Sequence, residues 1–218
     1  MNKIVPLLIA ETIANDFLLT LTSVINRYMI VGSIRRRNTR VTDIDLVIIP
    51  KSFSEFWALI NHLLELGTIE KGAKWGKKSR SLKYKHLNIE IYTATEQNYG
   101  YITWLRTGPA ESTQFVMTKL SKHKSTVRFS GGSAWHVDYN TLHPNYDPKL
   151  GYAKLARLKV ESEGTFFQLI GLPYIEPINR NNISYGTLNR TVNNPPLQVL
   201  QQKFYIQQHK PIKQLSMF

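Results

Sequence analysis

The chain has 218 residues, with 28 Lys and Arg against 15 Asp and Glu and no cysteine, which gives a formal net charge of +13. The absence of cysteine excludes disulfides, zinc-finger ligation and thiol catalysis. A hydrophobic fraction of 42% is typical of a folded domain with a core of its own. The positive charge favours a polyanionic partner, either nucleic acid or an anionic membrane surface.

The N-terminal segment predicts a helix rather than a membrane span or a signal peptide. Its apolar stretch, residues 4–10, is short and is followed by Glu11, Asn15 and Asp16. No uncharged run reaches the roughly 18 residues that a bilayer span needs. We therefore expect a soluble, cytoplasmic protein without a membrane partner. Apolar residues at helical spacing predict an amphipathic helix over residues 6–26.

The first half of the chain then alternates strands and helices. A short strand over residues 27–31 should end at the Gly32-Ser33 turn, where Ser33 could cap a brief helix whose free N–H groups face an anion. Farther on, Ser52 and Gly67 indicate the cap and the stop of a longer helix. The elements predicted after the turn are a strand over 44–49, a helix over 52–66, strands over 74–84 and 87–93, and a helix over 97–106.

A change in composition after Pro109 indicates a second, smaller unit. Helices are predicted near residues 110–122 and 162–170, with a Gly131-Gly132 turn between them. From about residue 181 the chain is rich in Asn and Gln and lacks periodicity, which predicts a tail with little core of its own. We expect an α+β fold with a mixed sheet and flanking helices, divided into residues 1–108, 109–180 and the tail 181–218.

Asp43 and Asp45 stand at the start of an apolar strand. Because side chains alternate along a strand, both carboxylates point the same way, roughly 6.5–7 Å apart. Two like charges so close are costly unless a cation neutralises them. The spacing suits two divalent ions roughly 3.5–4 Å apart, as in phosphoryl transfer. Glu90, on the polar face of the strand over 87–93, is the candidate third ligand of this predicted metal site.

The turn and the carboxylates belong to a longer pattern. Glu90 lies eighteen residues before Gly108, and the segment 170–180 ends the pattern with Gly-Leu-Pro-Tyr at its start. The order Gly-Ser, two Arg and Asp-x-Asp resembles the signature of the family X DNA polymerases, relatives of polymerase beta among the nucleotidyltransferases. The matching residues of that signature are Gly32, Ser33, Arg35, Arg36, Asp43 and Asp45. The resemblance covers residues from about 25 to 180 and implies a catalytic palm followed by a nucleotide-selecting C-terminal subdomain.

The resemblance implies a two-metal polymerase reaction. Asp43 and Asp45 would bridge two Mg²⁺ ions, with Mn²⁺ as an alternative, and Glu90 would hold the ion that activates the primer 3′-hydroxyl. The implied partners are a dNTP and a primer-template or gapped DNA, used by a monomer in short-gap DNA repair or replication. The implied nucleotide-binding residues are Gly32, Ser33, Arg36, Thr107 and Gly108.

Three departures from the family leave parts of this implication open. Glu90 replaces the usual Asp, and Asn88 stands where polymerase beta has an Arg. Leu105-Arg106 replaces the aromatic pair before the Thr-Gly, which leaves sugar selection and fidelity open. The lyase domain and the DNA-binding fingers of polymerase beta have no counterpart, so we expect no abasic-site lyase activity.

The C-terminal sequence carries a second resemblance. Gln214-Leu-Ser-Met-Phe218 is similar to the pentapeptide by which bacterial polymerases bind the sliding clamp, with Met for one Leu. Leu215, Met217 and Phe218 would enter an apolar groove, and Gln214 would orient the backbone. The predicted tail would tether the enzyme near a primer end. Together with the missing domains, this motif favours a bacterial, phage or viral source.

Alternatives stay open at this level. A nucleotidyltransferase that tails RNA or DNA without a template would carry the same signature, and a non-catalytic basic nucleic-acid-binding factor would carry the same charge. The basic ribbon over residues 71–85 is equally consistent with a nucleic-acid groove and with an exposed hairpin. Arg180 is expected to form an internal ion pair. The two Asp residues could instead form a salt-bridged strand end with Arg35, Arg36, Arg37 or Arg40.

Overall fold

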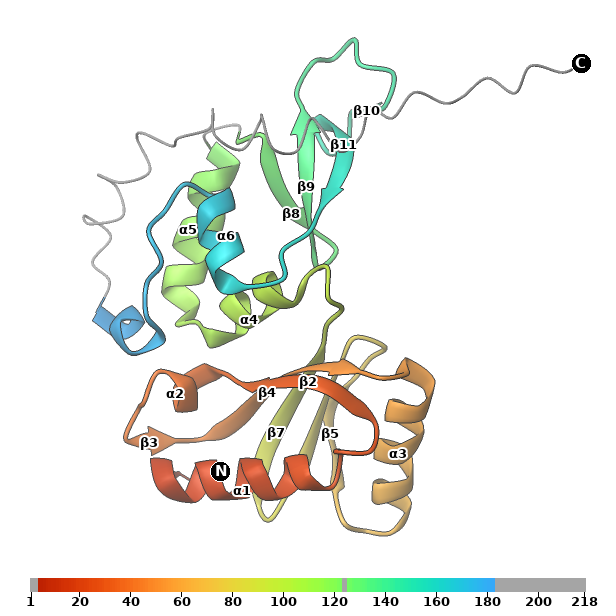
Figure 1. The fold of residues 1–218 in the computed structure, drawn as a ribbon, viewed down its shortest axis with the longest axis vertical. Helices are drawn as coiled ribbons and strands as arrows, with labels where there is room; N and C mark the ends of the chain where they lie inside the picture. The colour runs from red at the N-terminus through yellow and green to blue at the C-terminus, as the bar shows by residue number, and fades with distance from the viewer. Residues whose placement is uncertain (1–3, 123–124, 183–218) are drawn as a thin grey trace, which may run out of the picture.

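The computed structural model describes residues 4–122 and 125–182 in two units, each with its own β-sheet (Figure 1). The first unit has a five-stranded sheet in the order β2-β4-β7-β6-β5. Within it β4 and β7 are parallel, and the other neighbours are antiparallel. Its strands are β2 (Ile25–Ile30), β4 (Asp43–Pro50), β5 (Glu70–Trp75), β6 (Ser79–Tyr84) and β7 (Leu87–Thr93); β1 (Val5–Pro6) and β3 (Arg40–Val41) pair separately.

Two helices cover one face of the five-stranded sheet. α1 (Leu7–Leu19) and α3 (Phe53–Glu65) contribute to the same buried core as Leu46 of β4. Because side chains alternate along a strand, Asp43 and Asp45 lie on the opposite face. Figure 1 shows the second unit on that side of the sheet. The fold therefore turns the two carboxylates toward the space between the units.

The second unit packs helices against a four-stranded antiparallel sheet in the order β10-β11-β9-β8. Aromatic side chains build its core, in which the rings of Trp104 and Phe166 stack with centroids 4.0 Å apart. Its elements are α4 (Tyr99–Thr107), α5 (Ala110–Lys122), β8 (Val127–Ser130), β9 (Ser133–Asp138), β10 (Tyr146–Asp147), β11 (Tyr152–Leu158), α6 (Glu163–Leu169) and the 3-10 helix η1 (Pro177–Asn182).

The predicted α+β class is confirmed, and so are most helices. Ser52 caps α3, since its Oγ accepts a hydrogen bond from the Glu55 N–H at 3.4 Å. Gly67, with a φ of 68°, lies just beyond the end of this helix. The cap and stop signals of the sequence thus predicted this element closely.

Two predicted elements are wrong in extent. The strand predicted over 74–84 is the hairpin of β5 and β6, because the chain turns at Gly76, whose N–H donates to the Ser79 carbonyl at 2.8 Å. The helix predicted over 6–26 ends at Leu19, because residues 25–30 pair with β4. In the second case sheet pairing outweighs the helical spacing of the apolar residues.

The helix α4 lies near the predicted boundary between the two units. α4 contributes Tyr101 and Trp104 to the core of the second unit, while the predicted division at residue 108 stays a prediction.

The predicted tail lies, from residue 183 onward, outside the described residues, and with it Gln214 to Phe218. Within the described ranges, none of the helices has the length and apolar character that crossing a membrane requires.

Candidate active site

Two neighbouring strands carry the three predicted carboxylates. Asp43 and Asp45 alternate along β4 with the fully buried Ile44, and Glu90 on β7 lies opposite Asp45 in the parallel register. Asp43 and Asp45 line a cleft of about 490 Å³. Glu90 is not among the residues that line this cleft. The structure therefore brings the Asp pair to the cleft and places Glu90 beside it.

Asp45 is strongly perturbed by its surroundings. Its burial, together with the charges of Asp43 and Glu90, raises the pKa of the Asp45 carboxyl group to about 7. Arg106 and Arg36 lower this pKa but do not cancel the increase. A cation between Asp43 and Asp45 would favour the ionised carboxylate and remove the penalty. The electrostatics of the pair thus fit a cation site.

The turn after β2 approaches Asp45 so closely that residue 32 must be glycine. Gly32 has a φ of 63°, and a Cβ atom there would lie 2.1 Å from Asp45 Oδ2. The Val31 N–H donates to the Asp45 carbonyl at 2.8 Å, so the turn and the strand are fixed together. The predicted capping role of Ser33 is wrong, because α2 (Gly32–Arg35) begins before it and Val31 is the N-cap.

Ser33 and Arg36 add a hydroxyl and a guanidinium group to the lining of the cleft. Ser33 lines the cleft, and its buried Oγ has no hydrogen-bond partner among the described residues. Arg36 also lines it; its Nε donates to Asn181 Oδ1 at 2.8 Å, and its Nη1 donates to the Thr107 carbonyl. Burial lowers the pKa of Arg36, against the effect of Asp45. A hydroxyl without a partner and a guanidinium group that line one cleft fit a phosphate.

Thr107 and Gly108 support the arginines of the turn. Thr107 is fully buried; its hydroxyl accepts a hydrogen bond from Arg35 Nη1 at 2.7 Å and donates to the Thr103 carbonyl. Gly108 lines the cleft, and a Cβ atom there would lie 3.1 Å from Arg36 Nη1. Both residues were predicted to bind the nucleotide. Gly108 lines the cleft, whereas Thr107 does not line it and instead binds Arg35 and Arg36.

Glu90 is engaged by two neighbours instead of by the Asp pair. Lys74 Nζ lies 2.8 Å from both Glu90 carboxylate oxygens, and the Tyr92 hydroxyl donates to Oε2. Burial alone would raise the pKa of Glu90, but these two hydrogen bonds outweigh it and the pKa is lowered. Glu90 is therefore an ionised carboxylate with a cationic partner already in place.

The donor set fits a hard divalent cation in part. Within residues 4–122 and 125–182, no three acidic or His side chains converge closely enough to form a complete metal cluster. Asp43 and Asp45 supply carboxylate oxygens, which Mg²⁺ and Mn²⁺ prefer, on one face of one strand. The predicted set of three is thus present as a cleft-facing pair and a third carboxylate, Glu90, that is turned to Lys74.

Two residues that shape the site, Tyr92 and Arg106, had no predicted role in it. The Arg106 guanidinium lies 3.8 Å from the centroid of the Tyr92 ring, and both residues line the cleft. Strand alternation could have placed Tyr92 with Glu90, since they are two residues apart. The position of Arg106 on α4 carried no such signal, because it depends on how the two units pack.

An ion-pair network joins the turn to the second unit. Glu163 lies between Arg35, with which it forms an ion pair, and Arg180 Nη1 at 2.8 Å, and its side chain is 5% exposed. The predicted internal ion pair of Arg180 is confirmed. Arg37 pairs with Glu11. Arg35 and Arg37 thus have partners away from β4, so the alternative of a salt-bridged strand end for the two Asp residues is left with Arg36 and Arg40, which line the cleft with them.

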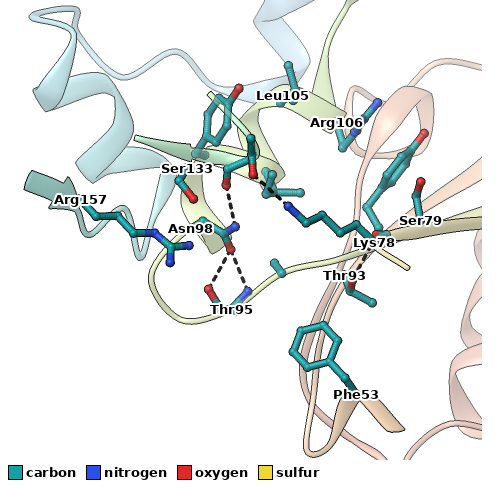
Figure 2. A pocket seen from close by; sticks show the side chains of 16 residues that line it. Phe53, Lys78, Ser79, Thr93, Thr95, Asn98, Leu105, Arg106, Ser133 and Arg157 are labelled. Atoms are coloured by element: carbon teal, nitrogen blue, oxygen red, sulfur yellow. Dashed lines mark hydrogen bonds between the residues drawn. The ribbon is translucent and has the colours of Figure 1, made fainter. Parts of the chain in front are cut away.

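A second cavity of about 350 Å³ lies next to the cleft and shares Tyr92, Leu105 and Arg106 with it. Figure 2 shows Lys78 and Asn98 pointing toward the β8–β9 turn. Lys78 Nζ donates to the Gly131 carbonyl at 3.0 Å, and Asn98 Nδ2 donates to the Gly132 carbonyl at 2.7 Å. The Lys78 bond joins the first unit to the β8–β9 turn beside the cleft, and the Asn98 bond ties the start of α4 to the same turn.

Comparisons with known proteins give a fold but no sequence relative. No family model matches the chain, and no curated protein matches it. Among the similar solved structures are two of Leishmania infantum polymerase beta. Its ternary P/T complex is 18% identical, with a TM-score of 0.65 over 82% of this chain and 77% of that one. Its ternary gap complex is 17% identical, with a TM-score of 0.65 over 83% and 71%. The chain therefore has a fold similar to that of polymerase beta.

Proposed function

We propose that this chain is a nucleotidyltransferase of the DNA polymerase X type that adds dNMP units to a primer 3′-hydroxyl. The observation that carries the proposal is a single cleft, on a polymerase beta-like fold, whose lining includes both the Asp pair and the turn residues Ser33 and Arg36. Its carboxylates fit divalent cations, and its hydroxyl and guanidinium groups fit phosphate. A nucleoside triphosphate with its metal ions needs both sets of groups in one cleft.

The cleft residues divide the work of binding and orientation. Two Mg²⁺ or Mn²⁺ ions held by Asp43 and Asp45, with Glu90 as the third ligand, would polarise the phosphoryl group and make the attacking hydroxyl more acidic. Ser33 Oγ would donate to a terminal phosphate oxygen. The Arg36 guanidinium, held from behind by the Thr107 carbonyl, would offer its remaining N–H groups to the triphosphate. Positioning and electrostatic stabilisation account for most of phosphoryl-transfer catalysis.

The charge and the fold suggest the partners. A net charge of +13 would hold primer-template or gapped DNA through its phosphates. We place the enzyme in short-gap DNA repair or replication, as a cytoplasmic monomer of a bacterial, phage or viral system. In this proposal the C-terminal residues Gln214 to Phe218, outside the described part of the chain, bind a sliding clamp.

Incorporation assays test the function. The full chain is incubated with each dNTP or NTP on gapped, open-template and single-stranded primers, with Mg²⁺ or Mn²⁺. We expect templated addition of dNMP that stops when the metal is chelated. Template-independent addition is the second candidate, because an enzyme with that activity would carry the same signature residues. Equal rates with and without template would favour that activity, and DNA binding with no incorporation under any condition would favour the non-catalytic factor.

A further inference from the structure

The contacts of Glu90 separate it from the other two carboxylates. Both of its oxygens are 2.8 Å from Lys74 Nζ, and Oε2 also accepts a hydrogen bond from Tyr92. Neither contact involves Asp43 or Asp45. The ammonium group of Lys74 therefore occupies the position beside Glu90 in which a metal ion would lie if Glu90 were its ligand.

The sheet itself directs Lys74 to Glu90. Asp45 pairs with Glu90 across β4 and β7, and Glu90 pairs with Ser81 across β7 and β6. On β5 the register shifts between Lys71 and Trp75, and the Lys74 N–H donates to Ser81 Oγ at 2.8 Å. A register shift of this kind re-aims a side chain. The irregularity therefore aligns Lys74 with Asp45 and Glu90 across four strands.

Glycine makes this irregularity possible. A Cβ atom on Gly72 would lie 2.5 Å from Ser81 Oγ and 2.7 Å from the Ser81 carbonyl. Backbone contacts this close exclude any larger residue at Gly72 unless β5 moves away from β6. The placement of Lys74 is therefore built into the backbone and does not depend on the rotamer of a long side chain alone.

We propose that Lys74 is a positioning residue that holds Glu90 in place of a divalent cation and yields it when the metal binds. The proposal rests on the function proposed above. The Lys74 side chain is 58% exposed and that of Glu90 is 21% exposed, so the pair is solvated on the lysine side. Such pairs are weak, and a divalent ion with two further Asp ligands displaces the ammonium group. Lys74 thus keeps Glu90 neutralised without closing the site.

The test is Mn²⁺ binding to the full chain without nucleotide or DNA, measured from the EPR signal of free Mn²⁺. We expect Lys74→Gln to bind Mn²⁺ about three- to fivefold more tightly than the wild type, because the metal no longer competes with the ammonium group. Lys74→Arg should restore weaker binding. Lys77→Gln, which removes the same charge from the β5–β6 turn, is the matched control and should change the affinity less than twofold, as roughly expected for an exposed charge.

A double-mutant cycle tests whether the gain in Mn²⁺ affinity of Lys74→Gln depends on the charge of Glu90. In a Glu90→Gln background, Lys74→Gln should give no gain in Mn²⁺ affinity. Equal affinity in wild type and Lys74→Gln, or a gain that persists without the Glu90 charge, would overturn the proposal. These outcomes are independent of the incorporation assay: a chain that binds Mn²⁺ as described but adds no nucleotide would contradict the proposed function and leave the role of Lys74 intact.

Discussion

The two sides of the acidic site are built differently. Asp45 packs against the turn at Gly32, and its backbone carbonyl accepts a hydrogen bond from the Val31 N–H. Burial raises the pKa of its carboxyl group. Glu90, its neighbour on β7, is held by an exposed lysine and a tyrosine hydroxyl, and its pKa is lowered. Asp45 has no cationic partner that offsets its burial, whereas Glu90 is already paired with the ammonium group of Lys74. The difference suggests a fixed half, around β4 and the turn, and an adjustable half around Glu90.

The largest expected effect comes from breaking the anchor of the fixed half. Glu163→Gln would leave the buried Arg180 and the partly buried Arg35 without the counter-charge that they share, so we expect a loss of roughly 3–5 kcal/mol in the free energy of unfolding. Urea denaturation measures it. Glu161→Gln, which removes an exposed partner of Lys159, is the control and should leave the midpoint unchanged. A similar shift in both variants would show that the network does not anchor the turn.

A second prediction tests the close approach of the turn to Asp45. Gly32→Ala and Gly67→Ala both place an alanine at a φ near 65°, but only at residue 32 does the new Cβ meet an atom, Asp45 Oδ2. Left-handed strain costs each variant about 1–2 kcal/mol. We expect Gly32→Ala to lose about 1–3 kcal/mol more, as in overpacked cores, and to lose incorporation. Equal stabilities of the two variants by urea denaturation would show that Asp45 can move away.

The third prediction concerns pH and the fixed half. The pKa of Asp45 is about 7 in the fold against 3.8 as the ordinary value, so its proton stabilises the folded state below pH 3.8. This contribution falls as the pH rises and is lost above about 7. With metal chelated, Asp45→Asn should therefore gain on the order of 2 kcal/mol over wild type at pH 8, and much less at pH 4. Thermal unfolding at both values measures the difference; a gain that does not depend on pH would contradict the assignment.

The smallest effect is expected in the adjustable half. Tyr92→Phe removes the hydroxyl that holds Glu90 and keeps the ring that contacts Arg106. One hydrogen bond to a charged group is worth roughly 1.5–3 kcal/mol at most, and Lys74 still holds Glu90, so we expect a change in incorporation rate of about threefold. Tyr84→Phe, whose hydroxyl bonds Asp16 away from the cleft, is the control. A loss as large as that of an Asp variant would show that Glu90 is as fixed as Asp45.

The sequence predicted the local features of the fold more completely than the contacts between distant segments. Alternation placed Asp43 and Asp45 on one face, and the cap signals at Ser52 placed α3. The four-stranded sheet of the second unit was not predicted, because only the Gly131-Gly132 turn marks its strands, and two of them, β8 and β10, are short. Such strands form through cross-strand pairing, which local propensity does not encode strongly.

The site shows the same limit. The resemblance to the polymerase signature implied that Ser33 and the Asp pair belong to one site, and the structure brings these residues into one cleft. The lysine on Glu90 could not be predicted, because it depends on a register shift in β5 next to Gly72. Arg106 and Asn181 reach the site only through the packing of the second unit. The parts that sequence reasoning missed are those that bring separate strands or units into contact.

The central claim is that Asp43 and Asp45 carry nucleotidyl transfer. Single-turnover primer extension with Mg²⁺ compares wild type, Asp43→Asn with Asp45→Asn, and the control Asp138→Asn on β9, where the new amide still accepts from the Asn140 N–H. Removal of several kcal/mol of metal-ion stabilisation predicts a rate loss of at least about three orders of magnitude in the double variant, with DNA binding retained. The control should extend primers like the wild type. Incorporation by the double variant within about tenfold of the wild-type rate would contradict the account.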